Sequence, residues 1–414
     1  MNKGIEKILQ CPLTHSDLTI LEENQVKDLN VRISMGSVYH LDGTRVQKQL
    51  EYAFSSCNGV FVYPVIDGIL ILRPDLAIPT NKDEASKYKY SIAIEKEAVM
   101  RFYDQVGWKQ VNEDLYADAD RFEDLRPVSR EYIHNCHLRV KQRINESGMY
   151  LLDVASGPIQ YREYLTYSDS YKFRICADIS FIALREAMKK LGDKGIYLLC
   201  DITNLPLRDN VVDGFVSLHT IYHVPAEEQK RAFEELYRVL KDDRSGVIVY
   251  SWGDRSLLMN ITMDSPIRWI TSLLLSTLPP TVKQAIKKVI RKTPKENPPS
   301  TIAVQERELS LQEPQLYFHA HSYQWYREEV KGSFNCDIAS WRSVSVPFMK
   351  RYVHDRLFGK WLLSFIYWME STFPVFFGRH GQFPMFICHK QSLIPGTRFR
   401  GHNTKFFLTA SQVI

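Results

Sequence analysis

Short apolar runs alternate with amphipathic stretches between Met149 and Trp252. The runs lie at 150–155, 173–178, 195–201, 211–218 and 246–252. Between them, residues 180–191 and 225–240 carry apolar side chains at helical spacing. Strand and helix in regular succession predict an α/β fold, in which a mainly parallel sheet carries helices on both faces.

The hydrophobic pattern changes on either side of this stretch. An apolar, β-branched run at 59–72, with Asp67–Gly68 as a turn signal, predicts a small β-rich module at the N-terminal end. After a Pro-rich, partly basic insertion, the pattern predicts helices over 322–330 and 357–370 and strands over 334–346 and 383–389. We therefore expect a β-rich module at 1–79, a helical lead-in at 80–148, an α/β domain at 149–393 with an insertion at 253–314, and a tail at 394–414.

Charge and cysteine content narrow the function classes. The chain has 53 basic and 48 acidic side chains, a net charge of +5, so no concentrated basic surface for nucleic acid is expected. Its seven cysteines are odd in number and spread out, which favours reduced thiols and a cytoplasmic protein. The longest apolar stretch, 267–278, is shorter than the about 20 residues that span a bilayer, and we expect neither secretion nor a membrane span.

Three acids lie at the ends of three successive predicted strands. Asp153 precedes the small residues of the sequence Leu-Asp-Val-Ala-Ser-Gly-Pro at 152–158, while Asp178 and Asp201 close the next two strands. The carboxyl ends of parallel strands meet at one sheet edge, where ligands bind in α/β folds. An acid about 20 residues past the glycine turn can accept hydrogen bonds from ribose hydroxyls. The acidic rim therefore favours a positively charged, sugar-bearing ligand, and the single glycine of the turn disfavours pyrophosphate.

These motifs resemble those of the class I S-adenosylmethionine-dependent methyltransferases. The sequence at 152–158 is similar to their first motif, Cys-Ala-Asp-Ile-Ser at 176–180 to the ribose motif, and Cys-Asp-Ile-Thr-Asn-Leu-Pro at 200–206 to the adenine motif. The resemblance implies S-adenosylmethionine as cofactor and a Rossmann-like sheet of seven strands, the last antiparallel. Ala155 departs from the family pattern because it stands where the family usually has its first glycine.

Carried over to this sequence, the resemblance assigns the cofactor site. Asp153 and the turn at 155–157 would hold the methionine end, Asp178 the ribose, and Asp201 the adenine. The implied cofactor residues are Asp153, Ala155, Ser156, Gly157, Asp178, Ile179, Asp201, Ile202 and Leu218.

The end of the fourth strand bears on the acceptor. Ser-Leu-His-Thr at 217–220 lacks the Asn/Asp-Pro-Pro-aromatic pattern of enzymes that methylate base or glutamine amino groups, which leaves transfer to an oxygen, an activated carbon or a simple amine. A hydroxyl acceptor gains from a base near pH 7, and histidine is the usual one. We take His219 as a cofactor or acceptor contact and His223 as the base; alternatively either histidine is a packing residue. The segment 102–108, with Tyr116, is either a lid over the site or an aromatic helix packed on the sheet.

The N-terminal module resembles the small zinc-ribbon activator proteins that partner tRNA and protein methyltransferases. A zinc ribbon needs two cysteine pairs, but Cys11 is followed by His15 and Cys57 has only serines beside it. We therefore expect a degenerate, metal-free module, with a hybrid Cys11, His15 and Cys57 site as the alternative. His134 and His137 are expected on a helix surface.

The insertion contains the apolar stretch 267–278 and an amphipathic basic helix at 282–292. It is expected to cover the acceptor pocket, with peripheral membrane contact or a homodimer interface as alternatives. Together these features predict a methyltransferase that acts at oxygen on a small-molecule or glycan acceptor in biosynthesis. Methylation of a macromolecule, tRNA or protein, and a non-catalytic scaffold remain the alternative functions.

Overall fold

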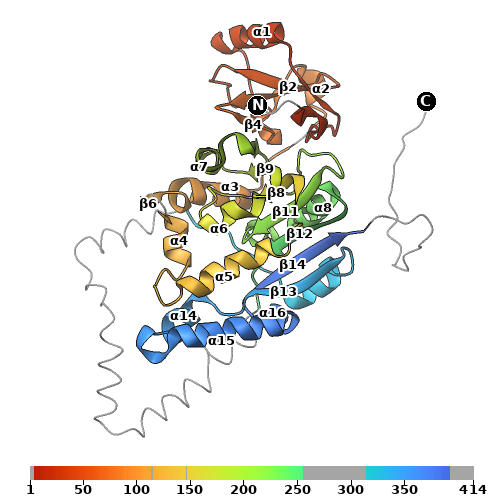
Figure 1. Cartoon of the computed structure of the whole chain (residues 1–414). Coiled ribbons are helices and arrows are strands. Elements are labelled where there is room, and N and C mark those ends of the chain that lie inside the picture. The colour runs from red at the N-terminus through yellow and green to blue at the C-terminus, as the bar shows by residue number, and fades with distance from the viewer. Residues whose placement is uncertain (1–3, 89, 113–114, 146, 255–313, 392–414) are drawn as a thin grey trace, which may run out of the picture.

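The computed structural model describes residues 4–88, 90–112, 115–145, 147–254 and 314–391 (Figure 1). The stretches 267–278 and 282–292, most of the predicted insertion and the predicted tail lie outside the described residues. The described part is built on one twelve-stranded sheet, with a small separate hairpin of β6 (Gln110–Asn112) and β7 (Leu115–Tyr116).

The strands that follow residue 147 lie in the order β10-β9-β8-β11-β12-β14-β13. Their bounds are Gly148–Val154 for β8, Tyr171–Asp178 for β9, Gly195–Leu199 for β10, Val212–Leu218 for β11, Leu240–Val249 for β12, Cys336–Arg342 for β13 and Phe383–Lys390 for β14. Strands β8 to β12 run parallel, while β14 is antiparallel to both β12 and β13. A mixed sheet of this kind, flanked by helices, fits a Rossmann-like fold.

Side chains alternate between the two faces of the sheet, as a period of two requires. Leu152 and Ile248 belong to one buried cluster, together with Phe233 and Leu236 of α8 (Gln229–Val239). Their sequence neighbours Leu151 and Val247 belong to a second cluster, with side chains of α5 (Arg130–Lys141) and α7 (Phe181–Leu191). The prediction of helices on both faces is therefore confirmed.

The N-terminal strands extend the same sheet, so the predicted count of seven strands is wrong for the sheet as a whole. Strand β4 pairs in parallel with β10, with Leu70 opposite Leu198 and Ile71 opposite Leu199. Beyond β4 follow β3, β2 and β1, and β5 pairs with β3. The bounds are Leu18–Ile20 for β1, Tyr52–Ser56 for β2, Phe61–Ile66 for β3, Ile69–Ile71 for β4 and Ile78–Pro79 for β5. An open edge at β10 explains the difference, because an unpaired edge strand accepts a further strand.

Helices fill the remaining segments, and several lie where the sequence pattern gave no clear signal. The N-terminal module contains α1 (Glu23–Ser34), and its far side from the main domain is formed by this helix (Figure 1). The predicted helical lead-in contains α2 (Lys82–Ala85), α3 (Ile94–Phe102), the π-helix η3 (Tyr103–Gly107), α4 (Ala117–Phe122) and α5. The others are α6 (Arg162–Leu165), α13 (Tyr323–Trp325), the π-helix η8 (Tyr326–Val330), α14 (Val346–Tyr352), α15 (Gly359–Thr372) and α16 (Pro374–His380).

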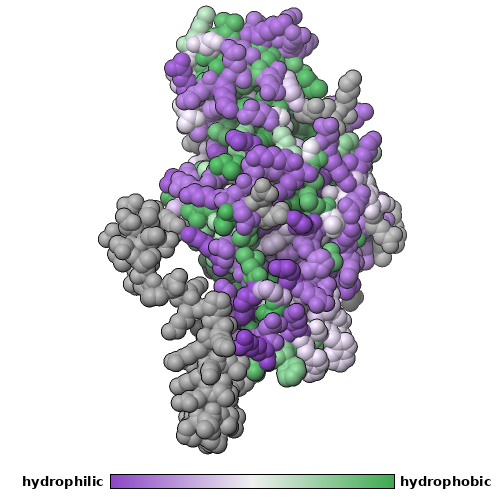
Figure 2. Space-filling model, turned by 60° about the vertical axis from the view of Figure 1, so that its left-hand side comes forward, coloured by the Kyte–Doolittle hydropathy of each residue, from purple (hydrophilic) through white to green (hydrophobic). Residues whose placement is uncertain are grey.

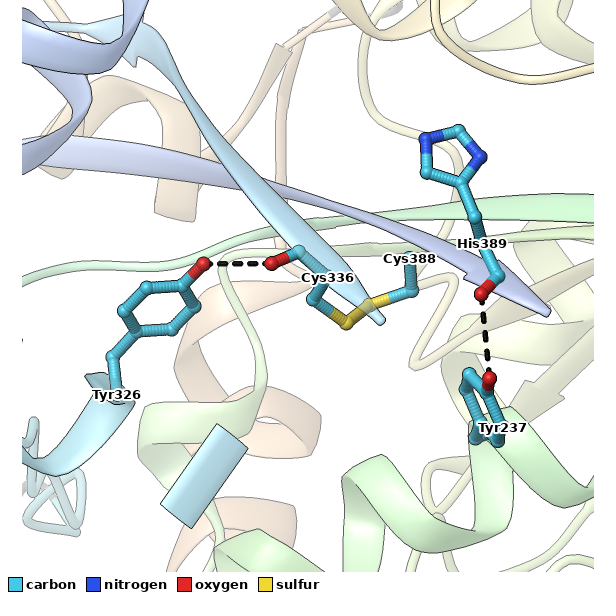
Figure 3. Close-up of a disulfide and its surroundings, with 5 residues drawn as sticks. All are labelled: Tyr237, Tyr326, Cys336, Cys388 and His389. Carbon is cyan, nitrogen blue, oxygen red and sulfur yellow. Dashed lines mark hydrogen bonds between the residues drawn. A yellow bond between two sulfur atoms is a disulfide. The ribbon is translucent and has the colours of Figure 1, made fainter. Parts of the chain in front are cut away.

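Cys336 and Cys388 form a disulfide between β13 and β14 (Figure 3). The two residues lie directly opposite each other in the antiparallel pair, with Cα atoms 4.0 Å apart. The Tyr326 hydroxyl donates a hydrogen bond to the Cys336 carbonyl at 2.8 Å. The prediction of seven reduced thiols is therefore wrong for this pair, since spacing along the sequence does not reveal which strands become neighbours. The remaining five cysteines are free.

Two further observations concern metal and membrane. Within the described residues, no group of three or more His, Cys, Asp or Glu side chains is arranged to hold a metal ion. In the N-terminal module, Cys11 is buried and its Sγ lies 3.1 Å from the Tyr63 hydroxyl, whereas Cys57 is exposed. Among the helices in the described ranges, none has both the length and the apolar character that crossing a bilayer requires.

Candidate active site

A cavity of about 960 Å³ opens at the carboxyl ends of strands β8, β9 and β11. Its walls come from the turn after β8, the end of β9, the segment after β10 and the end of β11, because these segments meet at one sheet edge. All the site residues named from the sequence line it: Asp153, Ala155, Ser156, Gly157, Asp178, Ile179, Asp201, Ile202, Leu218, His219 and His223. The structure therefore brings together residues that are up to 70 positions apart in the sequence.

The turn after β8 has an unusual backbone. Ala155, Gly157 and Ile159 have φ angles of 50°, 54° and 51°, in the left-handed region that favours glycine. A Cβ built at Gly157 would lie 2.9 Å from the Trp108 ring, so only glycine fits there without a shift. Ala155 takes the same backbone conformation at a cost of about 1 kcal/mol. This geometry explains why a glycine would suit the position that Ala155 occupies.

Asp178 is buried and is held by two backbone donors. Its carboxylate accepts hydrogen bonds from the amides of Gly157 at 2.9 Å and Ser180 at 2.8 Å. Burial raises the pKa of Asp178 to about 6, because desolvation outweighs the two hydrogen bonds that stabilise the charged form. A ligand that donated hydroxyl hydrogen bonds to this carboxylate would favour ionisation and bind the ionised form.

Asp153 lines the cavity and is also bonded inside the protein. Arg174, on the neighbouring strand β9, donates two hydrogen bonds to its Oδ2 atom, one of them from Nε at 3.0 Å. Burial raises the pKa of Asp153, and Arg174 opposes that shift. The second carboxylate oxygen is not part of this pair. Asp153 therefore braces the start of the turn through β9 as well as lining the cavity.

The Asp201 carboxylate is fully occupied by protein donors. Its Oδ1 atom accepts hydrogen bonds from the amide and the hydroxyl of Thr203, both at 2.9 Å. Its Oδ2 atom accepts one from Lys96 Nζ at 2.7 Å and one from the Tyr90 hydroxyl at 3.3 Å. Lys96, on α3, also forms an ion pair with Glu228. This buried cluster fixes α3 to the sheet edge, and the sequence reasoning missed Lys96.

The segment predicted as a lid or a packing helix lies over the turn after β8. The rings of Tyr103 and Trp108 stack at 4.6 Å between centroids, and both residues line the cavity. Asp104 accepts a hydrogen bond from the Ser180 hydroxyl, at the ribose motif. Tyr116 is buried and packs edge-on against Trp108, but it does not line the cavity. The α3–η3 segment is thus tied to the motif residues at several points.

The two histidines after β11 differ in their surroundings. Burial lowers the pKa of His223 to about 4, and its Nδ1 lies 2.7 Å from the Tyr317 carbonyl. A carbonyl only accepts, so Nδ1 carries the proton, and the unprotonated Nε2 accepts a long hydrogen bond of 3.4 Å from the Tyr103 hydroxyl. Burial, with Arg342 and His137 nearby, lowers the pKa of His219 well below its usual range. Both imidazoles are neutral near pH 7.

The far wall of the cavity was not predicted. It contains Trp341 and Arg342 from the end of β13 and Phe383 from the start of β14. Arg342 forms a buried ion pair with Glu123 at 2.6 Å, and its guanidinium lies 4.9 Å from each of the two aromatic ring centroids. In the sequence, the Trp-Arg pair lies inside the predicted strand 334–346, whereas in the structure it closes β13.

His137 also belongs to this wall, and its predicted surface position is wrong. Its side chain is buried and stacks on Trp341 at 5.6 Å, whereas the His134 side chain is half exposed. Ile133, Cys136 and Val140 are buried on the same helix face, at positions −4, −1 and +3 from His137. This apolar spacing was the signal that could have placed it inside.

Comparisons with known proteins agree with this picture. A family model described as a methyltransferase domain matches residues 152–248. No curated protein matches the chain. The matched segment begins in β8 and ends in β12, so it contains the turn, the three acids and both histidines of the cavity.

Several solved structures are similar to the chain at low identity. A chain from a complex that contains the Haloferax volcanii Trm112 methyltransferase activator is 14% identical, with 64% of this chain and 92% of that chain covered and a TM-score of 0.37. Haemonchus contortus phosphoethanolamine N-methyltransferase 2 in complex with S-adenosyl-L-methionine is 13% identical. The comparison covers 62% of this chain and 52% of that chain, with a TM-score of 0.34. A geranyl diphosphate methyltransferase in complex with the same cofactor is 12% identical. The comparison covers 62% of this chain and 85% of that chain, with a TM-score of 0.36.

Overlaps at these scores carry no argument about the acceptor. The match to the family model covers the cofactor motifs, which line one cavity at the sheet edge where an α/β fold binds its ligands. Residues 152–248 are therefore a methyltransferase domain, and the chain is an enzyme that uses S-adenosylmethionine as its methyl donor.

Proposed function

We propose that the enzyme transfers the methyl group of S-adenosylmethionine to an oxygen atom of a small-molecule or glycan acceptor. The observation that carries the proposal is the extent of the cavity, which runs from the cofactor motifs to the wall of Trp341, Arg342 and Phe383. A volume of about 960 Å³ is near the upper end of the range for small-molecule sites, which leaves room for the cofactor and a small acceptor together.

The cofactor assignment is part of the proposal. Asp178 would accept hydrogen bonds from the ribose hydroxyls, beside the Ala155–Gly157 turn at the methionine end. Because donors from Lys96, Tyr90 and Thr203 already occupy the Asp201 carboxylate, we assign Ile202 and the adjacent backbone to the adenine and give Asp201 the role of holding α3 in place. In this arrangement α3 and η3 act as the lid.

His223 suits transfer to a hydroxyl in spite of its low pKa. When a neutral hydroxyl attacks the sulfonium methyl, a C–O bond forms, the S–CH₃ bond breaks, and the oxygen becomes a protonated ether. Such an oxonium is far more acidic than imidazolium, so an imidazole with a pKa of about 4 can still accept the proton. Its unprotonated Nε2 is the accepting atom once the acceptor hydroxyl takes the place of the Tyr103 hydroxyl, and the Tyr317 carbonyl holds the ring in that tautomer.

The remaining assignments complete the proposal. Residues 149–393 would form the methyltransferase domain, 80–148 the lead-in with the lid, and 1–79 a metal-free module of zinc-ribbon-activator type. A cytoplasmic location and a homodimer remain predictions. Methylation of a tRNA or protein remains the alternative function, and it would need only one residue of the macromolecule to enter the cavity.

The test combines donor binding with an acceptor screen. Calorimetry with S-adenosylhomocysteine should give a dissociation constant in the micromolar range, and release of the same product should report turnover with hydroxylated metabolites and glycans. With an acceptor in hand, His223→Gln should lower kcat by about 10²-fold or more, while cofactor affinity stays within about threefold.

His321→Gln is the matched control, because His321 is also partly buried among aromatic rings but does not line the cavity. It should keep the wild-type kcat. An unchanged kcat in His223→Gln would remove the base from the proposal. Turnover with amines or macromolecules alone would replace the proposed acceptor class.

A further inference from the structure

Eight of the nineteen exposed large apolar side chains among the described residues lie on or beside α15 and α16. Trp361, Phe365 and Trp368 are spaced i, i+4 and i+7 on α15, so they share one helix face. Their exposed fractions are 68%, 45% and 56%. Neighbouring rings contact each other, at 5.7 Å for Trp361 and Phe365 and 5.8 Å for Phe365 and Trp368. The face is thus a continuous aromatic stripe.

More apolar side chains lie at both ends of this stripe. Leu357 and Phe358 precede α15 and are 51% and 82% exposed. Phe373, Val375 and Phe376, at the start of α16, are 50%, 60% and 49% exposed. We call these residues, together with Trp361, Phe365 and Trp368, the α15–α16 face. Soluble proteins rarely expose so many large apolar side chains together unless a partner covers them.

Basic side chains accompany the α15–α16 face. The exposed cations on α14, α15, α16 and the loops between them are Lys350, Arg351, Arg356, Lys360 and Arg379. The acids in residues 345–380 are Asp355 and Glu370, and Glu370 is buried in an ion pair with Arg139 at 2.8 Å. The exposed charge of residues 345–380 is therefore strongly positive, and a partner that covers the α15–α16 face gains by supplying anions as well as an apolar layer.

The α15–α16 face lies at one end of the molecule. Figure 1 places α15 along the end of the main domain that is opposite to the N-terminal module. The space-filling view in Figure 2 shows, at that lower end, pale and green residues beside strongly hydrophilic ones. A helix that lies on the outside of a domain can meet a flat surface without rearrangement of the sheet.

We propose that the α15–α16 face binds the surface of an anionic lipid bilayer. Trp and Phe side chains insert at the level of the headgroups, and each nearby Lys or Arg gains from the negative surface potential. The helix would lie in the plane of the interface. The proposal concerns a contact outside the methyltransferase cavity and does not depend on the acceptor.

Charge argues against two other occupants of the α15–α16 face, a second copy of the chain and the sequence 267–292. In a twofold dimer the same face would meet itself, which would place cations opposite cations with Asp355 as the one exposed acid of residues 345–380 to offset them. The sequence 267–292 has apolar runs, but it carries Arg268, Lys283, Lys287, Lys288, Arg291 and Lys292 and no acid. Covering the face with that sequence would also bring like charges together.

Vesicle sedimentation with the full chain tests the proposal. Wild type should bind phosphatidylcholine vesicles that contain about one third phosphatidylserine, and bind pure phosphatidylcholine at least tenfold more weakly. The triple variant Trp361→Ala, Phe365→Ala, Trp368→Ala should lose at least tenfold in partitioning. The double variant Arg356→Ala, Lys360→Ala should lose about 25-fold, since each cation contributes about fivefold.

The matched control removes exposed apolar side chains from α1 and from the residue that caps its C-terminus, at the far end of the molecule. Val31→Ala with Met35→Ala, at residues 53% and 75% exposed, should bind vesicles like wild type. The proposal would be overturned if wild type did not bind anionic vesicles, or if the triple variant bound them as well as wild type does. It would also be overturned by light scattering that shows a wild-type dimer which the triple variant turns into a monomer.

Discussion

The protonation state of Asp178 should control cofactor affinity. Its carboxylate has a pKa of about 6 because it is buried, and it already accepts hydrogen bonds from two backbone amides. Ribose hydroxyls would donate two more, which a protonated carboxyl group cannot accept equally well. The cofactor would therefore bind the ionised form and lower the pKa of Asp178 on binding.

The size of the effect follows from this pKa. About nine tenths of the molecules have an ionised Asp178 at pH 7, and about one tenth at pH 5, for a pKa near 6. If only the ionised form binds, the apparent affinity falls about tenfold between pH 7 and pH 5, equal to about 1.4 kcal/mol. The sign is fixed: affinity is complete above the pKa and is lost as pH falls through it.

Calorimetric titration with S-adenosylhomocysteine between pH 5 and pH 8 measures this dependence. Below pH 7, binding should release protons, and the observed enthalpy should vary with the ionisation enthalpy of the buffer. In Asp178→Asn the group no longer titrates, so the affinity should be weaker than wild type at pH 7 and flat with pH. Circular dichroism at each pH establishes that the fold is kept.

Asp118 provides the control, because it lines the same cavity and burial raises its pKa to about 6 as well. Asp118→Asn should keep the tenfold dependence on pH. Equal affinity of wild type at pH 5 and pH 7 would refute the reasoning. A dependence that survives in Asp178→Asn and disappears in Asp118→Asn would identify Asp118 as the titrating group and would remove the support for the proposed ribose contact.

Three further changes test the framework of the site. Lys96→Met leaves the buried Asp201 without its cation and should lower the free energy of unfolding in urea by about 3 kcal/mol. Its control is Lys87→Met, which removes an exposed ion pair with Glu84 and should leave the midpoint of the urea unfolding transition unchanged. Ala155→Gly relieves a left-handed backbone and should raise that free energy by about 1 kcal/mol, while Ala183→Gly inside α7 should lower it by a similar amount. Cys336→Ser opens a link across 52 residues and should cost about 4 kcal/mol; the denatured wild type should show five titratable thiols before reduction and seven after it.

The sequence predicted the parts of the site that are local in the chain. Asp153, Asp178 and Asp201 could be placed at one edge because each lies at the end of an apolar run and the carboxyl ends of parallel strands meet at one edge of the sheet. All three line the cavity. Positions of this kind depend only on strand order and direction, which the alternation of strands and helices already implies.

Contacts between distant segments could not be predicted in the same way. Lys96 reaches Asp201 across 105 positions, and Arg342 reaches Glu123 across 219. No periodicity links such residues, because a buried ion pair depends on how whole helices pack. The pairing of β4 with β10 has the same origin, since any exposed strand edge can accept a strand. His137 is different, because the helical spacing of its apolar neighbours could have predicted that its side chain is buried.

The two ends of the cavity differ in what they can recognise, and this difference decides how to search for the acceptor. The end beside β8 and β9, where we propose the donor, holds buried acids with fixed partners, whereas the far wall has aromatic rings around Arg342, whose charge Glu123 neutralises. Such a wall favours an apolar or amphiphilic body over a free anion. Val346 and Pro347 of α14 also line this region, and α15 with its exposed aromatic face follows α14 in the chain. Hydroxylated amphiphiles presented in anionic vesicles are therefore the acceptors to screen first.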